Sequence, residues 1–265
     1  MAKVDVLIPT RNRSEALTAT LTSLYFQSFS DFRVIISDQS DNFIASETIK
    51  TIFRMYSANK EKVTLLHNLP RKGIAQQRQF LLNTTTAEYC LFLDDDLILE
   101  PYVLTNMFKA ITEEKCGFVG MAPIGLSFKK DIRPKEQSVE FWSCGVKPEA
   151  VTPVSKKWQR HKLHNAANIY HVAKKFKLKP ENQQKYKIAW VGGCVLYDTS
   201  KLKVCGGYSF WDKVPKVTCG EDVLAQLRVM KKFGGCGLLP SGAYHQELPT
   251  TLINRKHDAP FLLGI

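Results

Sequence analysis

The chain has 265 residues, of which 44% are hydrophobic, and a formal net charge of +12 at pH 7. This length and composition suit one large α/β domain, or two small ones, with a full globular core. No apolar run reaches the ~18 residues that a membrane-spanning helix needs. The seven cysteines are scattered without a C-x-x-C pair, which argues against a zinc site or a disulfide framework.

The basic charge predicts an anionic partner. Charge alone does not distinguish nucleic acid, a phosphorylated substrate and an anionic membrane surface. The first residues, MAKVDVLIPT, enter an apolar strand pattern at once and leave no room for a signal peptide. We therefore expect a cytoplasmic protein, with peripheral contact to the inner face of the membrane as an open alternative.

The first third of the chain alternates apolar runs with helical patterns. The expected strands are Val4–Pro9, Arg33–Ser37, Val63–Leu66 and Tyr89–Leu93, and the expected helices between them are Ala16–Gln27, Asp41–Ala58 and Gly73–Leu82. Ser14 is expected to cap the first helix. The second should bury Ile44, Ile49, Ile52 and Phe53. Strands alternating with helices indicate βαβ units, right-handed crossovers and a parallel sheet, hence an α/β fold.

The pattern changes after a helix at Pro101–Thr112, with Pro101 in its first turn, and a strand at Phe118–Ala122. Residues Lys129–Lys187 hold 15 lysines and arginines against 5 acidic residues, so nearly all of the net charge of +12 lies here. Within this basic segment, Asn165–Lys179 could form a basic helix that groups Ile169, Tyr170, Ala173 and Phe176 on one face. A solvated basic face is an equal alternative to a binding surface. Regular patterns return at Ile188–Tyr197, Val223–Phe233 and Cys236–Leu239.

The strongest local pattern is Cys90–Pro101, CLFLDDDLILEP. An apolar run reads as a buried strand, and three consecutive carboxylates, Asp94, Asp95 and Asp96, follow it. They repel one another and cannot be buried unpaired. They stand at the carboxyl end of a strand, where open α/β sheets bind ligands. A hard divalent cation, held in turn by phosphate oxygens, would stabilise them; a solvated acidic turn is the alternative.

Other candidates follow earlier strands. Asp38 ends the second strand, where an acidic residue commonly bonds a ribose or a base edge, or simply forms an Asx turn. The first loop, PTRNR, contains neither G-x-G-x-x-G nor a P-loop motif. Its Arg11 and Arg13 could face a phosphate or base, and Arg78 on the third helix could do the same or be an exposed helix residue.

Three further candidates lie late in the chain. Glu221 and Asp222 open a helix, either as acids favoured by the helix dipole or as a general base for an acceptor hydroxyl. Gly192-Gly193 suggests an interrupted strand that something approaches closely, or a bulge. His245 is a lone histidine, which is more often structural than a ligand, although neutral imidazole can complete a divalent-ion site.

The motifs VDVLIPTRNR, VIISDQS, KGIAQQRQF, CLFLDDDLILEP, WVGGCVLYDTSKLKVCGGY and CGEDVLAQLR occur in this order. Together they resemble the GT-A glycosyltransferases of family 2, inverting enzymes that use nucleotide-diphosphate sugars. The resemblance covers about residues 3–125 and 187–246 and implies a Rossmann-like, mostly parallel sheet flanked by helices. It also implies a variable basic insertion on the acceptor side, and a metal-dependent transfer of a sugar to an acceptor hydroxyl.

The resemblance implies a role for each candidate. Positions that hold the nucleoside are matched by the first loop, with Pro9, Thr10, Arg11 and Arg13, and by Asp38 and Arg78. Asp94 or Asp95 would meet the ribose, Asp96 would bind Mn²⁺ or Mg²⁺, and His245 would be a third metal contact. Gly192 and Gly193 would form the wall beside the donor sugar, and Asp222, next to Glu221, would be the catalytic base. Elementary chemistry agrees, because inversion needs one carboxylate base and a metal can stabilise the leaving diphosphate.

We expect one domain with a nucleotide-sugar half (1–125), a variable basic insertion (126–186) and an acceptor and catalytic half (187–265). The donor would be a UDP-, dTDP- or GDP-sugar, and the acceptor a glycan, a lipid-linked glycan or a protein. No motif of the family matches residues 126–186, so the resemblance does not identify the acceptor. Two alternatives stay open: a non-catalytic nucleotide-sugar-binding component of a glycosylation complex, and a nucleic-acid-binding module. No nucleic-acid partner is expected, because that module would leave the carboxylates without a task.

Overall fold

The computed structural model describes residues 2–42, 46–59, 63–250 and 256–264. Its centre is an eight-stranded sheet in the order β3-β2-β1-β4-β8-β6-β9-β7. The strands are β1 (Val4–Thr10), β2 (Phe32–Asp38), β3 (Val63–His67), β4 (Tyr89–Leu93), β6 (Phe118–Gly120), β7 (Gln184–Tyr186), β8 (Cys194–Asp198) and β9 (Gly235–Leu239). The first four pair in parallel, β6 is parallel to β9, and β8 and β7 run antiparallel to their neighbours. The sheet is mixed and mostly parallel, as predicted.

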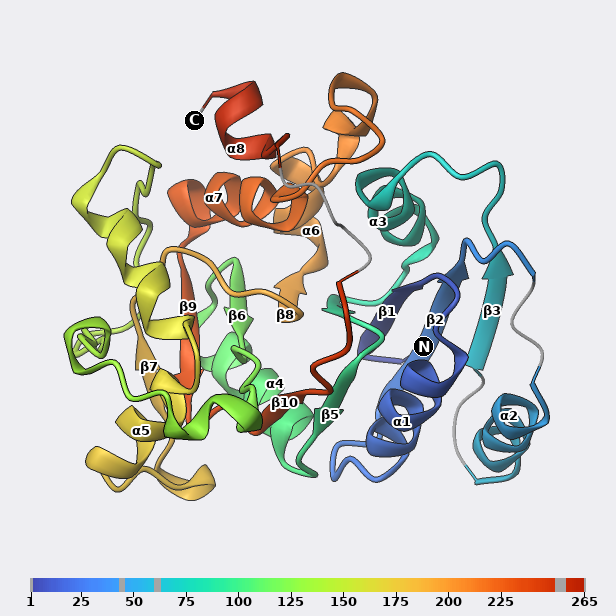
Figure 1. Cartoon of the computed structure of the whole chain (residues 1–265), viewed down its shortest axis with the longest axis horizontal. Coiled ribbons are helices and arrows are strands. Elements are labelled where there is room, and N and C mark those ends of the chain that lie inside the picture. Colours follow the sequence, from blue (N-terminus) through green and yellow to red (C-terminus); the bar gives the residue numbers. More distant parts are fainter. Residues whose placement is uncertain (1, 43–45, 60–62, 251–255, 265) are drawn as a thin grey trace.

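Helices cover both faces of this sheet (Figure 1). One layer contains α1 (Ser14–Tyr25), α2 (Glu47–Asn59) and α4 (Val103–Glu114), and the other contains α3 (Ile74–Thr84), α6 (Thr199–Val204) and α7 (Glu221–Phe233), with α8 (Ala259–Leu263) packed on α7. Alternate strand residues divide between the two cores: Val6 and Ile8 of β1 face the first layer, and Leu7 faces the second. This period-two alternation is what a sheet buried on both faces requires.

A small second sheet brings the late part of the chain to the end of β4. Strand β5 (Leu97–Leu99) directly follows the three aspartates and pairs antiparallel with β10 (Ala243–His245). In this register His245 lies opposite Leu97, and the amide of Gln246 donates to the carbonyl of Asp96 at 2.9 Å. The pairing therefore places His245 beside the carboxylates.

Three expected helix starts are wrong, one because the helix begins earlier and two because tertiary hydrogen bonds hold the expected first residues. Helix α1 begins at Ser14 itself, because the carbonyl of Arg13 takes the first helical bond, from Leu17. Helix α2 begins at Glu47, since Asp41 instead bonds the side chain of Asn12. Helix α4 begins at Val103 rather than Pro101, whose carbonyl accepts the amide of Ser28 in the preceding turn. The predicted core residue Ile44 lies outside the described residues.

Three expected elements are shorter than predicted. Strand β6 ends at Gly120, since its ladder with β8 ends at the pair Gly120 and Val195. The run Ile188–Tyr197 is a strand from Cys194 onward, because the backbone of Val191 bonds the side-chain amide of Gln226 at 2.8 and 2.7 Å instead of a neighbouring strand. The basic helix is confined to α5 (Asn168–Lys175), and Phe176, expected on its apolar face, is 46% exposed.

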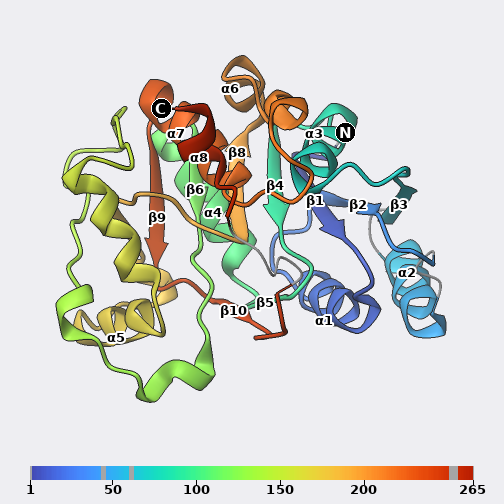
Figure 2. The same cartoon turned by 45° about the horizontal axis from the view of Figure 1, so that its top comes forward.

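The basic segment, which ends with β7, forms one end of the molecule beside β9 (Figure 2). Its other regular elements besides α5 and β7 are short 3₁₀ helices, namely η1 (Leu126–Lys130), η2 (Pro134–Glu136), η3 (Lys156–His164) and η4 (Pro180–Asn182). Ion pairs tie it together: Arg160 bonds Glu149 at 2.6 Å and Glu140 at 3.0 Å, and Lys187 also reaches Glu140, at 3.2 Å. Part of the basic charge is therefore used within the segment.

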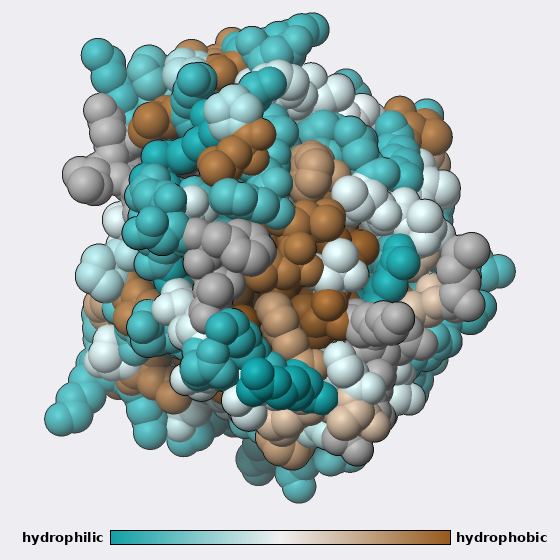
Figure 3. All heavy atoms as spheres, turned by 90° about the vertical axis from the view of Figure 1, so that its right-hand side faces the viewer, coloured by the Kyte–Doolittle hydropathy of each residue, from teal (hydrophilic) through white to brown (hydrophobic). Residues whose placement is uncertain are grey.

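The opposite end of the sheet is the edge strand β3. Figure 3 faces this side of the molecule, and hydrophobic residues gather in its centre within a hydrophilic surround. Val63, Leu65 and Leu66 of β3 are half-buried, as expected for a strand that ends the sheet order. No predicted site residue lies on this strand.

Candidate active site

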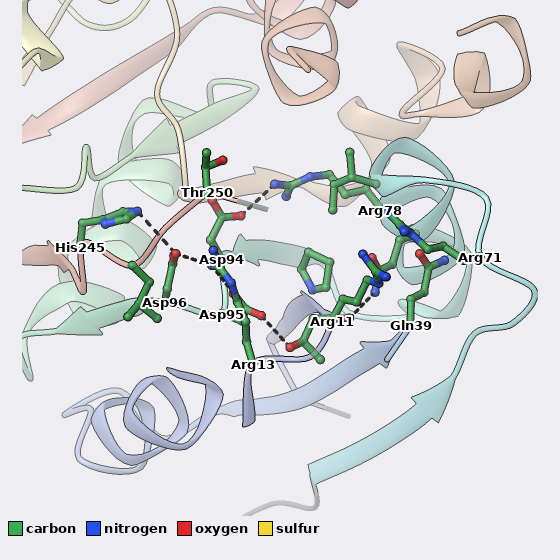
Figure 4. A pocket seen from close by; sticks show the side chains of 15 residues that line it. Arg11, Arg13, Gln39, Arg71, Arg78, Asp94, Asp95, Asp96, His245 and Thr250 are labelled. Atoms are coloured by element: carbon green, nitrogen blue, oxygen red, sulfur yellow. Dashed lines mark hydrogen bonds and ion pairs between the residues drawn. The ribbon is translucent and has the colours of Figure 1, made fainter. Parts of the chain in front are cut away.

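A cavity of about 420 Å³ opens at the carboxyl ends of β1 and β4. It is lined by Pro9, Thr10, Arg11, Arg13, Gln39, Arg71, Ile74, Gln77, Arg78, Asp94, Asp95, Asp96, His245, Leu248 and Thr250. Nine of these lining residues are predicted site residues. Figure 4 shows the three aspartates in the middle, with His245 on one side and Arg11, Gln39 and Arg71 on the other. The cavity therefore has a metal-compatible side and a cationic side, separated by carboxylates.

Asp95 is the buried anchor of the triplet. Its carboxylate accepts the Thr10 hydroxyl at 2.6 Å and faces the Arg13 guanidinium at 3.4 Å, and its carbonyl accepts the hydroxyl of Thr20 at 2.8 Å. Burial, aided by the neighbouring charge of Asp96, raises the pKa of Asp95 to about 6 although Thr10 and Arg13 oppose the rise. Asp95 thus fixes the loop after β1 against the loop after β4.

Asp96 and His245 form the metal-compatible side. The imidazole Nε2 of His245 lies 3.5 Å from a carboxylate oxygen of Asp96, and Nδ1 of the same ring accepts the amide of Glu247 at 2.7 Å. An oxygen and a nitrogen ligand this close fit a divalent ion, which commonly takes few protein ligands and completes its shell with phosphates and water. Within the described ranges no group of three or more His, Cys, Asp or Glu side chains gathers around a common point.

Arg13 links this pair to the chain after β10. Its guanidinium donates to Asp96 at 2.6 Å and to the carbonyl of Pro249 at 2.5 Å. Leu248 and Thr250, on either side of Pro249, line the cavity. The segment after His245 is therefore tied to the carboxylates through one arginine.

Arg78 joins the donor side of the cavity to the start of α7. Its Nη2 donates to Asp94 at 2.9 Å and its Nε to Glu221 at 3.0 Å, and its side chain is 7% exposed. Burial alone would lower the pKa of Arg78, but the charges of Asp94 and Glu221 hold that pKa well above its ordinary value. The alternative of an exposed helix arginine is wrong, because α3 turns this residue into the site.

Glu221 and Asp222 form a second acidic group at the N-terminus of α7. Burial, followed by the charge of Asp222, raises the pKa of Glu221 to about 7 against the influence of Arg78. Burial also raises the pKa of Asp222, with Arg78 lowering it and Asp94 raising it. A carboxylate with a raised pKa is a stronger base than a free one, which is the property that general-base catalysis needs.

Five predicted residues are not among the described residues that line the cavity: Asp38, Gly192, Gly193, Glu221 and Asp222. Asp38 is fully buried, and its carboxylate accepts the amide of Ser40 at 2.8 Å, as in the Asx-turn alternative. The carbonyl of Gly193 accepts the amide of Asp94 at 2.8 Å. A side chain at Gly193, whose φ is +74°, would meet Leu97, Pro123 and Asp94, whereas the space at Gly192 is open. Gly192 therefore leaves room for a ligand to approach the backbone.

Sequence reasoning missed several lining residues. Gln77 is 3% exposed, and its amide donates to the carbonyls of Thr10 and Ser37 at 3.0 and 2.6 Å, which joins the ends of β1 and β2. The sequence offers one indication of this role, because Gln77 directly precedes Arg78, and both are buried residues of α3. Arg71 and Gln39 come from loops, and nothing in their local pattern marks them.

The sequence model of the family described as "Glycosyl transferase family 2" matches residues 5–173, which is more than half of the chain. The chain belongs to this family. The predicted family is confirmed. None of its helices in the described ranges combines the length and apolar composition that crossing a bilayer requires.

Two curated relatives are similar over part of this family 2 chain. A Haemophilus influenzae protein named "Uncharacterized glycosyltransferase" is 29% identical over 110 residues, which cover 42% of this chain and 35% of the relative. A Campylobacter jejuni protein named "GalNAc(5)-diNAcBac-PP-undecaprenol beta-1,3-glucosyltransferase" is 27% identical over 114 residues, which cover 43% and 36%. The matches span about a third of each relative's length.

Solved structures confirm the fold. Staphylococcus aureus TarS 1–349 superposes with a TM-score of 0.58 at 19% identity, covering 92% of this chain and 60% of the 1–349 chain. Its complex with UDP-GlcNAc gives 0.57 at 19% identity, with 94% and 60% covered. The mannosyltransferase PcManGT from Pyrobaculum calidifontis, in complex with GDP-Man and Mn²⁺, gives 0.52 at 17% identity, with 89% and 56% covered. The GT-A architecture predicted from the sequence is therefore the one observed.

Proposed function

We propose that this family 2 chain is a metal-dependent inverting glycosyltransferase that moves a sugar from a nucleotide-diphosphate sugar to an acceptor hydroxyl in glycan or glycoconjugate biosynthesis. The observation that carries the proposal is the convergence of Asp94, Asp95 and Asp96 with Arg13, Arg78 and His245 in one cavity at the strand ends. Open α/β sheets bind their ligands at this place.

The donor would lie across the cavity with its nucleoside on the cationic side. Thr10, Arg11 and Pro9 line that side from the end of β1, and Arg71 and Gln39 face them. Asp94 or Asp95 is proposed to meet the ribose, and the buried Asp38 would support the nucleoside side from the end of β2. The base could be that of a UDP-, dTDP- or GDP-sugar. TarS in its complex with UDP-GlcNAc and PcManGT with GDP-Man are fold neighbours whose ligands differ in the base.

A divalent ion, Mn²⁺ or Mg²⁺, would be held by Asp96 and His245, and when bound it would stabilise the charge of the departing diphosphate. Arg13 already lies at Asp96, 2.6 Å away. Its position lets the guanidinium bond a diphosphate oxygen beside the ion. Gly192 and Gly193 would form the wall against which the donor sugar lies.

The acceptor hydroxyl would lose its proton to a carboxylate of Asp222. This residue is half-buried at the start of α7, and Glu221 next to it is linked through Arg78 to Asp94 on the donor side. A base held on one face of the sugar and a leaving group held on the other produce inversion. Glu221 is thus proposed as the positioning partner of the base.

The acceptor is proposed to meet the basic insertion, residues 126–186, between the nucleotide-sugar half (1–125) and the catalytic half (187–265). Its chemistry remains one of the three predicted classes: a glycan, a lipid-linked glycan or a protein. The name of the Campylobacter jejuni relative includes "PP-undecaprenol", which favours a lipid-linked acceptor among them.

Donor binding gives the direct test. We expect calorimetric titration with UDP-, dTDP- and GDP-sugars to detect binding in Mn²⁺ that chelation by EDTA abolishes. Asp96→Ala should weaken this binding at least about 10-fold, because even the loss of a group that only supports a metal ligand lowers metal affinity by about this factor. Asp212→Ala, an exposed aspartate of η5 (Ser209–Lys213), is the matched control. Equal donor binding by wild type and Asp96→Ala would contradict the metal assignment, and binding of no donor would contradict the function.

A further inference from the structure

Residues 126–132 form an exposed loop of mixed apolar and basic character. All seven are exposed, and the apolar side chains Leu126, Phe128 and Ile132 are 48%, 50% and 61% exposed. Lys129 and Lys130 lie between them in the sequence. Three large apolar side chains on one short exposed segment are more than a solvated basic face requires, since exposed apolar residues are normally scattered singly.

Helix α5 lies beside this loop and adds to its charge (Figure 2). The ammonium groups of Lys129 and Lys174 both lie over the ring of Tyr170, at 5.2 and 4.6 Å from its centroid, so one aromatic ring joins the two elements. The exposed end of α5 continues with Lys175, Phe176 and Lys177. Loop and helix together make one surface of lysines and apolar side chains, which we call the η1–α5 surface.

The η1–α5 surface is fixed to the active site. The carboxylate of Glu247 accepts the amide and the hydroxyl of Ser127 at 3.1 and 2.5 Å, and the backbone amide of Glu247 donates to His245. At the other end of the connection, Ile124 exchanges backbone hydrogen bonds with β10 at 2.9 and 3.0 Å. Whatever binds the surface is therefore held at a constant distance from the cavity.

We propose that the η1–α5 surface docks this protein on a bilayer of anionic phospholipid. Leu126, Phe128 and Ile132 would enter the interfacial region while Lys129, Lys130 and Lys174 meet lipid phosphates, the combination that holds amphipathic segments at membranes. A second copy of the chain fits poorly, because it would bring two basic surfaces together. Nucleic acid would satisfy the lysines and leave the three apolar side chains unburied.

This docking deepens the proposed function and rests on it in one respect: it assigns the acceptor to the lipid-linked class. The active site would face a substrate confined to the membrane surface, so diffusion in two dimensions would replace a search in solution. The docking itself needs neither donor nor metal, because none of the residues of the surface lines the cavity.

Vesicle co-sedimentation tests the proposal. The full chain should bind vesicles of 70% phosphatidylcholine and 30% phosphatidylglycerol at low salt, and bind pure phosphatidylcholine much less. Lys129→Ala with Lys130→Ala should weaken binding about 30-fold, as expected for two lysines near a charged surface. Phe128→Ser with Ile132→Ser should weaken it at least about 10-fold. The matched controls are Lys231→Ala with Lys232→Ala on α7, and Phe26→Ser with Val204→Ser at exposed positions elsewhere, which should bind as wild type does.

Each outcome bears on the proposal. No vesicle binding at low salt, or controls that weaken binding as much as the surface variants, would overturn it. Loss with the lysine pair but not with the apolar pair would show an electrostatic contact without insertion and would equally contradict the proposed docking. Donor titration of the same variants separates the two proposals. If the chain binds the donor but not the vesicles, the docking proposal is wrong and the proposed glycosyltransferase function is unaffected.

Discussion

The cavity and the basic segment are both rich in charge, and they use it in opposite ways. In the cavity, Arg78 and Asp95 are 6% and 7% exposed, and their partners come from elements far apart in the chain. In the basic segment, residues 126–132 are all exposed. Buried charges that converge alter one another's pKa and can perform chemistry, whereas exposed ones can only decide what the surface binds. The predictions below test this division.

The largest expected effect is on turnover. Asp222→Asn should retain donor binding and lower the rate of transfer about 10²- to 10⁴-fold, because the amide cannot take the acceptor proton. Steady-state transfer assays combined with donor titration would measure both quantities. Asp212→Asn, the exposed control, should change neither. Wild-type turnover in Asp222→Asn would remove this residue from the mechanism and leave Glu221, its buried neighbour, as the candidate base.

Stability should likewise separate a buried, converging charge of the sheet from an exposed one of the basic segment. Asp5→Ala should lower the free energy of unfolding by about 3 kcal/mol, because the buried carboxylate binds Arg33, the Thr85 hydroxyl and the amides of Thr86 and Ala87. Arg133→Ala, which opens the exposed ion pair of Arg133 with Asp131 in the basic segment, should have a much smaller effect, because exposed ion pairs contribute little to stability. Urea unfolding of both variants would measure the difference. Equal losses would mean that the basic segment is as integral to the folded core as β1.

The pH dependence of the Asp5 effect has a definite sign. Burial would raise the pKa of Asp5, but Arg33, Thr85 and the two amides outweigh it and lower that pKa below the ordinary 3.8. A lowered carboxyl pKa stabilises the fold above the unfolded-state pKa, and the contribution is lost as pH falls through the folded-state value. The gap between wild type and Asp5→Ala should therefore be full at pH 7 and shrink in acid below pH 3.8.

The sequence predicted the parts of the site that strand ends fix. Asp94, Asp95 and Asp96 directly follow β4, and Thr10 ends β1 as the partner of Asp38 in the β1–β2 ladder. The predicted helix starts at Asp41 and Pro101 are wrong, because tertiary hydrogen bonds hold those residues outside the helices. Helix α1 starts at Ser14, before the predicted Ala16. The partnership of Arg78 with Glu221 spans 143 residues, a contact that no local pattern encodes. The basic segment, built largely from short 3₁₀ helices and loops, has no periodicity from which its path could be inferred.

Arg78 provides the final test, because it joins Asp94 of the cavity to the acidic pair at the start of α7. Its charge lowers the pKa values of both Glu221 and Asp222, and the two carboxyls titrate as a pair. Arg78→Met removes that charge, so both pKa values should rise. The base must be deprotonated to act, hence the acidic limb of the kcat/KM profile should move to higher pH.

Two further variants make the shift interpretable. Arg78→Lys keeps a positive charge and should move the acidic limb less than Arg78→Met, which separates electrostatics from disturbed folding. Lys129→Ala removes an equal charge from the basic segment and should leave the limb in place, because an exposed charge outside the cavity is screened by water and salt. A profile that moves equally in Lys129→Ala and Arg78→Met would mean that net charge, and not the geometry around Glu221, sets the titration.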